Sequence, residues 1–127
     1  MTKENLRLLD ANLNRLREGI RVVEDIYRYI FNDKQNGLKL KKLRHNSRID
    51  LYHELLDSRD IQNDVLKTST KSEQNREDLN SILIANFKRA QESARVLEEF
   101  GKLIDTKISE NFKNIRYELY HLEKGIV

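Results

Sequence analysis

A segment of sixteen residues occurs twice in this chain of 127 residues, and this repeat constrains the fold more than any other feature. The first copy, residues 11–26, reads ANLNRLREGIRVVEDI, and the second, residues 85–100, reads ANFKRAQESARVLEEF. Seven residues are identical at this offset of 74 positions, whereas unrelated segments of ordinary composition share roughly one. Five of the seven are polar or charged, although helical patterning alone would repeat apolar residues. The repeat therefore predicts a duplicated structural unit.

The spacing of apolar residues indicates a helical protein. Between Leu6 and Tyr27 they recur at the i, i+3, i+4, i+7 intervals of one helix face. The chain has no proline and only four glycines, so little interrupts a helix, and no segment alternates like a strand. We expect four helices, at about residues 3–31, 38–56, 73–104 and 108–124.

Polar segments separate these helices. The first helix is expected to stop near Asn32-Asp33, and Asn36-Gly37 to make the turn that follows. The polar stretch of residues 57–71 is the one long connection. Thr70 and Glu73 fit a capping box at the start of the third helix.

These elements predict an all-α fold, a four-helix bundle-like single domain over residues 1–127. It consists of two repeated helical hairpins, about residues 3–57 and 73–124, related by a pseudo-two-fold axis. The absence of cysteine excludes a disulfide scaffold, a zinc ribbon and a cysteine nucleophile, and it suits a reducing cytoplasm. No apolar run approaches the roughly 18 residues that a membrane span requires, so we expect a cytoplasmic protein without a membrane segment.

Charge and glycine content narrow the function classes. Net charge is +3 from 24 basic and 21 acidic residues, a balance that does not favour nucleic acid as a partner. The four glycines stand alone, so a glycine-rich phosphate loop is excluded and any nucleotide must be bound by side chains and helix ends.

The repeated residues lie mostly away from the main apolar stripe of the helix. Exposed ion pairs within a helix stabilise it by only about 0.2 to 0.5 kcal/mol each. This stabilisation is too small to explain why both copies keep the same asparagine, arginine and glutamate residues. Three interpretations stay open: a buried polar network that fixes the register of the hairpins, a ligand site, or unselected remnants of a duplication. The identical pairs are Ala11/Ala85, Asn12/Asn86, Arg15/Arg89, Glu18/Glu92, Arg21/Arg95, Val22/Val96 and Glu24/Glu98.

A ligand at this surface would be anionic, because arginine is suited to two-pronged recognition of phosphate. The two-fold axis would bring four repeated arginines toward one region: Arg15, Arg21, Arg89 and Arg95. Carboxylates beside them could orient the guanidinium groups or hold a divalent cation. The second helix adds Arg44 and His45, and the long connection adds Arg59, Asp60 and Asp64. The ordinary interpretation is that the first two lie on a solvent-exposed helix face and that the other three form hydrogen bonds within the loop.

Several strings of this sequence resemble a known family. They are LDANLNR at residues 9–15, REGIRVVED at 17–25, LRH at 43–45, RD at 59–60, DV at 64–65, and the second copy of the repeat. They resemble the helical domain that precedes thiamine-phosphate synthase in some bacteria, which is regarded as an alternative hydroxymethylpyrimidine phosphate kinase. The resemblance extends over nearly the whole chain.

The resemblance implies transfer of the γ-phosphoryl group of ATP, with Mg²⁺, to 4-amino-5-hydroxymethyl-2-methylpyrimidine phosphate. Such a transfer needs aligned phosphates, neutralised charge and exclusion of water. On this basis we expect catalytic roles for Arg15, Glu18, Arg89 and Glu92. We expect substrate binding by Asn12, Arg21, Arg44, His45, Arg59, Asn86 and Arg95. The metal candidates are Asp10, Asp25, Asp60 and Asp64.

Two departures and two rival functions accompany this prediction. Leu66 stands where the family pattern has glycine after Asp64-Val65, and the second copy has Ser93 where the first has Gly19.

One rival is a non-catalytic helical module that binds a thiamine-pathway enzyme, such as thiamine-phosphate synthase, or a phosphorylated metabolite. The other is a nucleic-acid binder built on the basic run of residues 39–48, the weakest of the three. A homo-oligomer is compatible with all of them.

Overall fold

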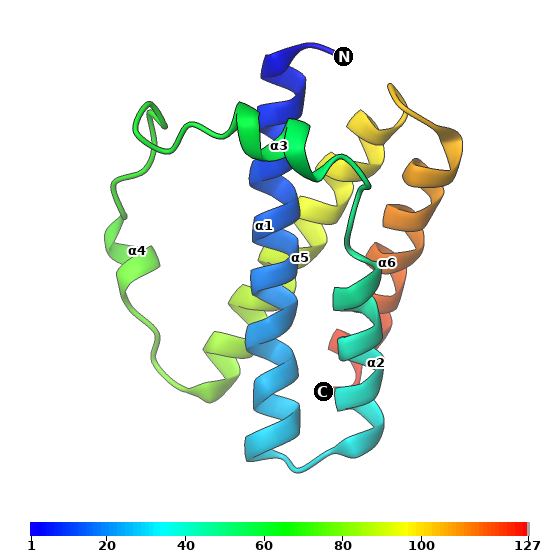
Figure 1. The fold of residues 1–127 in the computed structure, drawn as a ribbon. Helices are drawn as coiled ribbons and strands as arrows, with labels where there is room; N and C mark the ends of the chain where they lie inside the picture. The colour runs from blue at the N-terminus through cyan, green and yellow to red at the C-terminus, as the bar shows by residue number, and fades with distance from the viewer. Residues whose placement is uncertain (127) are drawn as a thin grey trace.

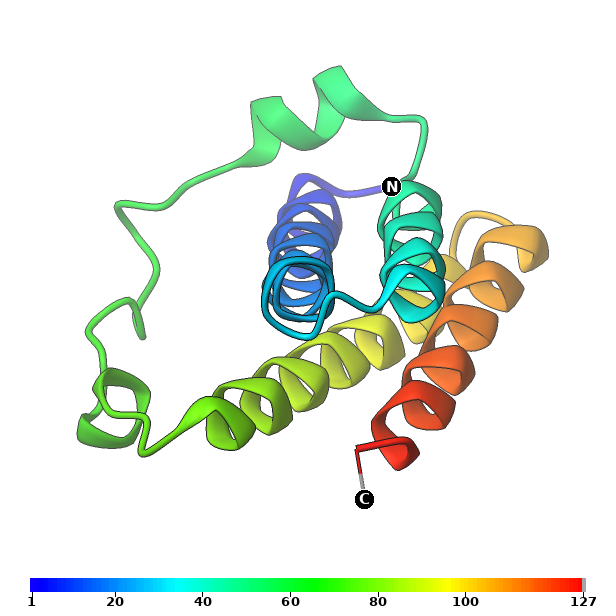
Figure 2. The ribbon, with the colours of Figure 1, turned by 90° about the horizontal axis from the view of Figure 1, so that it is seen from below.

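The computed structural model describes residues 1–126, which fold into helices and their connections without a strand. The elements are α1 (Lys3–Asp25), the π-helical turn η1 (Ile26–Ile30), α2 (Lys34–Asn46), α3 (Tyr52–Ser58), α4 (Lys71–Gln74), α5 (Leu79–Gly101) and α6 (Thr106–Lys124). The long helices α1 and α5 cross at the centre, and α3 lies across the N-terminal half of α1 (Figure 1). Helix α2 lies between α1 and α6, and α6 packs along α5 (Figure 2). The all-α, bundle-like class is confirmed, and the two-fold symmetry of the hairpins stays a prediction.

The crossing of α1 and α5 is close because small residues meet there. A Cβ atom added at Gly19 would lie 3.2 Å from the carbonyl oxygen of Asn86 and 3.4 Å from the Cβ of Ala90. Ala90 and Ala94 are fully buried beside it. The predicted apolar stripes form the core around this crossing: Leu9, Leu13, Leu16, Ile20 and Val23 of α1, Leu83, Phe87 and Leu97 of α5, and Phe112, Ile115 and Leu119 of α6.

The first predicted helix is confirmed over α1 and η1, but the turn after it was misplaced. Asn36-Gly37 lies within α2, not in the turn. The chain reverses at Asn32, which adopts a left-handed conformation with φ of 52°. Asparagine tolerates that region and commonly ends helices in it. Asp33 then caps α2, because its carboxylate accepts a hydrogen bond from the backbone N–H of Asn36 at 3.0 Å.

The second predicted helix, residues 38–56, is wrong as one element, since the structure divides it into α2 and α3. The break follows Asn46, where the buried hydroxyl of Ser47 donates to the carbonyl of Leu43 at 2.7 Å. Serine side chains of this kind compete with the helical backbone for hydrogen bonds. Ile49 is buried in the short connection that follows, and α3 begins at Tyr52.

The third predicted helix is also divided. Thr70 and Glu73 form the expected capping box, but α4 contains only four residues. A second capping box, between Asp78 and Ser81, starts α5. The connection between α3 and α5 bows away from the other helices before it returns to α5 (Figures 1 and 2). The fourth predicted helix is confirmed as α6, and none of the described helices is long and apolar enough to cross a bilayer.

Candidate functional site

Two repeated glutamates each join a long helix to another helix through an arginine, one in each half of the chain. Glu24 is 1% exposed and accepts hydrogen bonds from Nε and Nη2 of Arg44 on α2, at 2.6 and 3.1 Å. Its counterpart Glu98 is 6% exposed and accepts from Nε and Nη2 of Arg116 on α6, at 3.0 and 2.8 Å. The hydrogen bond to Glu24 raises the pKa of Arg44 above its ordinary value, so this guanidinium stays charged. Each glutamate therefore ties a long helix to a shorter one.

The repeated asparagines also have matching contacts. The side-chain amide of Asn12 donates to the carbonyl of Leu8 at 3.0 Å, and that of Asn86 donates to the carbonyl of Ile82 at 2.8 Å. Asn12 is buried, so little of its side chain is left for a ligand. These asparagine bonds stay within one helix, so among the repeated residues it is Glu24 and Glu98 that favour the interpretation of a polar network that fixes helix packing.

The repeated arginines and Glu18 and Glu92 are different, because they are exposed. On α1 these residues are Arg15, Glu18 and Arg21, and on α5 they are Arg89, Glu92 and Arg95. Arg21 pairs with Asp25 at 3.4 Å, and Arg95 pairs with Glu98 at 2.9 Å and Glu99 at 3.3 Å. Side chains on this part of the repeat remain accessible to a ligand.

Three adjoining depressions along α1 form the candidate site. The α3 cleft, of about 840 Å³, lies between α1 and α3 and is lined by Arg17, His45, Arg48, Tyr52 and His53, among others. The loop pocket, of about 420 Å³, lies beside the start of the long connection and is lined by Arg7, Asn12, Arg15, Asp60 and Asp64, among others. The arginine shelf, of about 360 Å³, is formed by Asn14, Arg17, Glu18, Arg21 and Arg44. Because Asn14 lines all three, they form one continuous surface.

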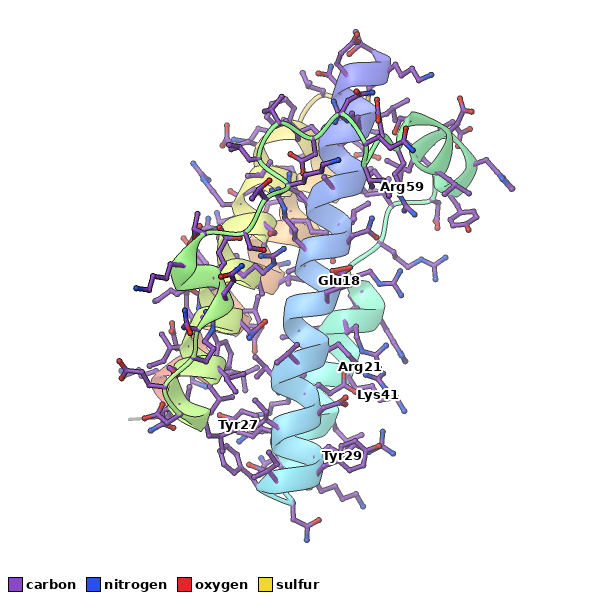
Figure 3. All side chains as sticks on the ribbon, turned by 90° about the vertical axis from the view of Figure 1, so that its left-hand side faces the viewer. Glu18, Arg21, Tyr27, Tyr29, Lys41 and Arg59 are labelled. Carbon is purple, nitrogen blue, oxygen red and sulfur yellow. The ribbon has the colours of Figure 1, made fainter. Side chains whose placement is uncertain are left out.

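Asp10 and Arg59 meet where the α3 cleft adjoins the loop pocket, and both residues line both depressions. Arg59 donates from Nε and Nη2 to the two carboxylate oxygens of Asp10, at 2.8 and 2.9 Å. The Asp10 side chain is 8% exposed and that of Arg59 is 41% exposed. The hydrogen bond with Asp10 raises the pKa of Arg59. Arg59, Glu18 and Arg21 follow one another along the same side of α1 (Figure 3).

The structure brings together most of the predicted residues of the first copy, leaves those of the second copy elsewhere, and places Asp25 outside the three depressions. The three depressions contain Asp10, Asn12, Arg15, Glu18, Arg21, Arg44, His45, Arg59, Asp60 and Asp64. Asn86, Arg89, Glu92 and Arg95 line none of the three. The expected convergence of four repeated arginines is therefore not found in this surface.

The predicted metal candidates are mostly engaged by protein groups. Asp60 accepts from the side chain and the backbone N–H of Asn63, at 2.7 and 3.1 Å, and the side-chain bond lowers the pKa of Asp60 most. Asp64 accepts from the backbone N–H of Leu66 at 3.0 Å, and Asp25 has one buried oxygen without a hydrogen bond. Among the described residues, no three His, Cys, Asp or Glu side chains gather as metal ligands. Mg²⁺ that arrives with a nucleotide needs only one or two protein carboxylates, since the substrate phosphates supply further ligands.

Sequence reasoning missed several residues of this surface. Arg7 and Arg17 share the helix face of Asp10 and Arg21, and their spacing could have identified them. Tyr52 and His53 could not be identified from their spacing, because they line the α3 cleft only as a result of the break between α2 and α3.

Comparison with known proteins gives one family and one group of relatives. The sequence model of the ThiD2 family matches residues 7–125. A thiamine-phosphate synthase of Thermosynechococcus vestitus is 43% identical over 123 residues, which cover 94% of this chain and 34% of that protein. The thiamine-phosphate synthases of Rhodopirellula baltica and Nostoc punctiforme are 40% and 39% identical, over 91% and 95% of this chain and 32% and 35% of their own lengths. The chain thus spans a third of the length of these relatives. No solved structure matches it.

Proposed function

The chain belongs to the ThiD2 family, and we propose that it acts in thiamine biosynthesis as a kinase. Its substrates are ATP and 4-amino-5-hydroxymethyl-2-methylpyrimidine phosphate, and its products are ADP and the pyrimidine diphosphate. Two findings support the pathway: the family match and the similarity to one third of several thiamine-phosphate synthases. The kinase activity is proposed from the resemblance of the sequence motifs and from the chemistry of the surface along α1.

The reaction needs charge neutralisation more than acid or base chemistry. An oxygen of the pyrimidine phosphate forms the new bond to the γ-phosphorus of ATP, and the bond from that phosphorus to the β-phosphate oxygen breaks. The attacking oxygen belongs to an ionised phosphate, so no general base is required. The protein has to hold two anions together and keep water out. Arginine suits this task because its planar guanidinium group can form two parallel hydrogen bonds with phosphate.

The row of arginines along α1 is the observation that carries the proposal. Arg17 lines both the α3 cleft and the arginine shelf, where Arg21 and Arg44 accompany it. Arg7 and Arg15 line the loop pocket together with Asn14. A ligand with several phosphate groups could therefore contact guanidinium groups from one depression to the next.

The α3 cleft suits the aromatic ring of a substrate. Its volume of about 840 Å³ is within the usual range of small-molecule sites. The rings of Tyr52 and His53 lie 5.4 Å apart at its edge and can stack on a heterocycle. These residues replace Asn12 as candidates for pyrimidine contact, since the amide of Asn12 already donates within α1.

Glu18 of the arginine shelf and Asp64 of the loop pocket are the carboxylates that could share Mg²⁺ with a nucleotide. When bound, Mg²⁺ neutralises charge on the phosphate oxygens. The arginines supply the remaining positive charge, and they orient the phosphates.

A coupled assay of ADP release tests the proposal. We expect ADP release from ATP and Mg²⁺ that depends on the pyrimidine phosphate. Binding of the pyrimidine phosphate without ADP release would favour the non-catalytic module instead.

A further inference from the structure

Among the described residues, three carboxylates each accept two hydrogen bonds from an arginine outside their own helix: Glu24, Glu98 and Asp10. Glu24 and Glu98 occupy equivalent positions of the repeat, so a bridge of this kind occurs in both halves of the chain. Asp10 does not, because Ile84 stands at the equivalent position of the second copy. The bridge between Asp10 and Arg59 is therefore specific to one half of the molecule, the half that contains the three depressions.

The position of Arg59 differs from that of the arginines in the other two bridges. Its side chain is 41% exposed, whereas those of Arg44 and Arg116 are 15% and 13% exposed. Arg59 follows the last residue of α3, and the next carbonyl, that of Asp60, accepts a hydrogen bond from Arg7 at 2.8 Å. The backbone is thus anchored, while the guanidinium group lies at the surface.

We propose that Arg59 bridges the phosphate groups of the two substrates, exchanging its hydrogen bonds with Asp10 for hydrogen bonds with phosphate. The inference rests on the proposed kinase function. One substrate occupies the α3 cleft and the other the loop pocket, and their phosphates meet at the junction that Arg59 shares with both. Asp10 is a positioning residue, which holds the guanidinium at this junction before the substrates bind.

This arrangement makes the two partners act in opposite directions on anion binding. Arg59 attracts a phosphate, so its loss weakens binding. Asp10 competes with the phosphate for Arg59 and repels it, so removal of the Asp10 charge strengthens binding. A bridge that only joins α3 to α1 would give both changes the same direction, through loss of structure.

The test measures binding of inorganic pyrophosphate by calorimetry, together with kcat, on the full chain. Arg59→Lys keeps the charge but loses the two-pronged geometry, so pyrophosphate affinity should fall by about tenfold and kcat by about 100-fold. Asp10→Asn should bind pyrophosphate more tightly and lower kcat. The matched control is Arg116→Lys, which changes the equivalent atoms of a bridge away from the depressions and should leave both quantities unchanged.

Failure of the inference and failure of the kinase function give different results. If the parent protein phosphorylates the pyrimidine and Arg59→Lys matches Arg116→Lys in kcat and affinity, the inference is wrong and the function stands. If the parent has no turnover but the two substitutions shift affinity in opposite directions, the anion-binding role of Arg59 stands without the kinase. Should Asp10→Asn fail to fold, NMR of the parent decides: pyrophosphate must shift the Nε–H signal of Arg59 and not that of Arg116. A shift of neither signal contradicts the inference.

Discussion

Glu24 and Glu98, 74 positions apart at equivalent positions of the sequence repeat, each accept hydrogen bonds from an arginine of another helix. Both are buried on a long helix, and both accept hydrogen bonds from an arginine of a shorter helix packed within the bundle. A helix-joining bridge of this kind therefore occurs in both halves of the chain. Among the exposed arginines of the repeat, only those of the first copy, Arg15 and Arg21, line the depressions along α1.

The bridge between Glu98 and Arg116 should be essential for stability. Arg116→Ala leaves a buried carboxylate with only the half-exposed Arg95 beside it, and it should lower the free energy of unfolding by about 3 kcal/mol. Arg95→Ala removes the exposed partner and should cost less than about 1 kcal/mol. Urea unfolding of both variants gives the comparison. Equal losses would show that burial of the bridge has no special importance.

Two glycine substitutions should change stability in opposite directions. Gly37→Ala places a methyl group in open space on α2 and should stabilise the protein by about 0.5 to 1 kcal/mol, through helix propensity. Gly19→Ala places a methyl group 3.2 Å from a backbone oxygen of α5 and should cost about 1 kcal/mol. Thermal unfolding monitored by circular dichroism distinguishes them. A stabilising Gly19→Ala would mean that the two central helices can separate without loss.

Activity should depend on α1 rather than on α5. Arg17→Ala removes the guanidinium shared by the α3 cleft and the arginine shelf and should lower kcat/KM by about 100-fold. Arg89 lies outside the three depressions, so Arg89→Ala should change kcat/KM little. Steady-state kinetics with the pyrimidine phosphate measures both. A larger loss of kcat/KM in Arg89→Ala than in Arg17→Ala would contradict this expectation. It would favour the site with contributions from both copies that the repeat alone predicted.

The turn at Asp60 should depend on pH. Hydrogen bonds from Asn63 lower the pKa of this carboxyl below its ordinary value of 3.8. A lowered pKa means that the turn is stabilised fully above the ordinary value, and that this stabilisation disappears as the pH falls through the folded-state pKa. An NMR titration of the Asp60 carboxyl carbon should give a midpoint below 3.8. A midpoint at or above that value would contradict these hydrogen bonds.

The sequence predicted the parts of the fold that depend on apolar spacing. The stripe from Leu9 to Val23 forms the core of α1, and the one from Phe112 to Leu119 forms that of α6. The breaks after Asn46 and before Leu79 depend on individual hydrogen bonds of Ser47 and of the capping box at Asp78, which periodicity does not detect.

The candidate site likewise contains residues that spacing could predict and residues that depend on the observed packing. Exposed polar residues of α1 could be assigned to one face from their spacing, as Asp10 and Arg21 show. Tyr52 and His53 could not, because their positions depend on the direction of α3 after the break. The pairing of Asp10 with Arg59, 49 positions apart, likewise depends on the packing of α3 against α1.

Phosphorus NMR of the reaction mixture tests the central claim most directly. The protein, ATP, Mg²⁺ and 4-amino-5-hydroxymethyl-2-methylpyrimidine phosphate are incubated together, and the phosphorus signals are followed with time. The account predicts that the monophosphate signal disappears while the paired signals of the pyrimidine diphosphate and those of ADP appear in equal amounts. An unchanged monophosphate signal in the presence of folded protein would contradict it.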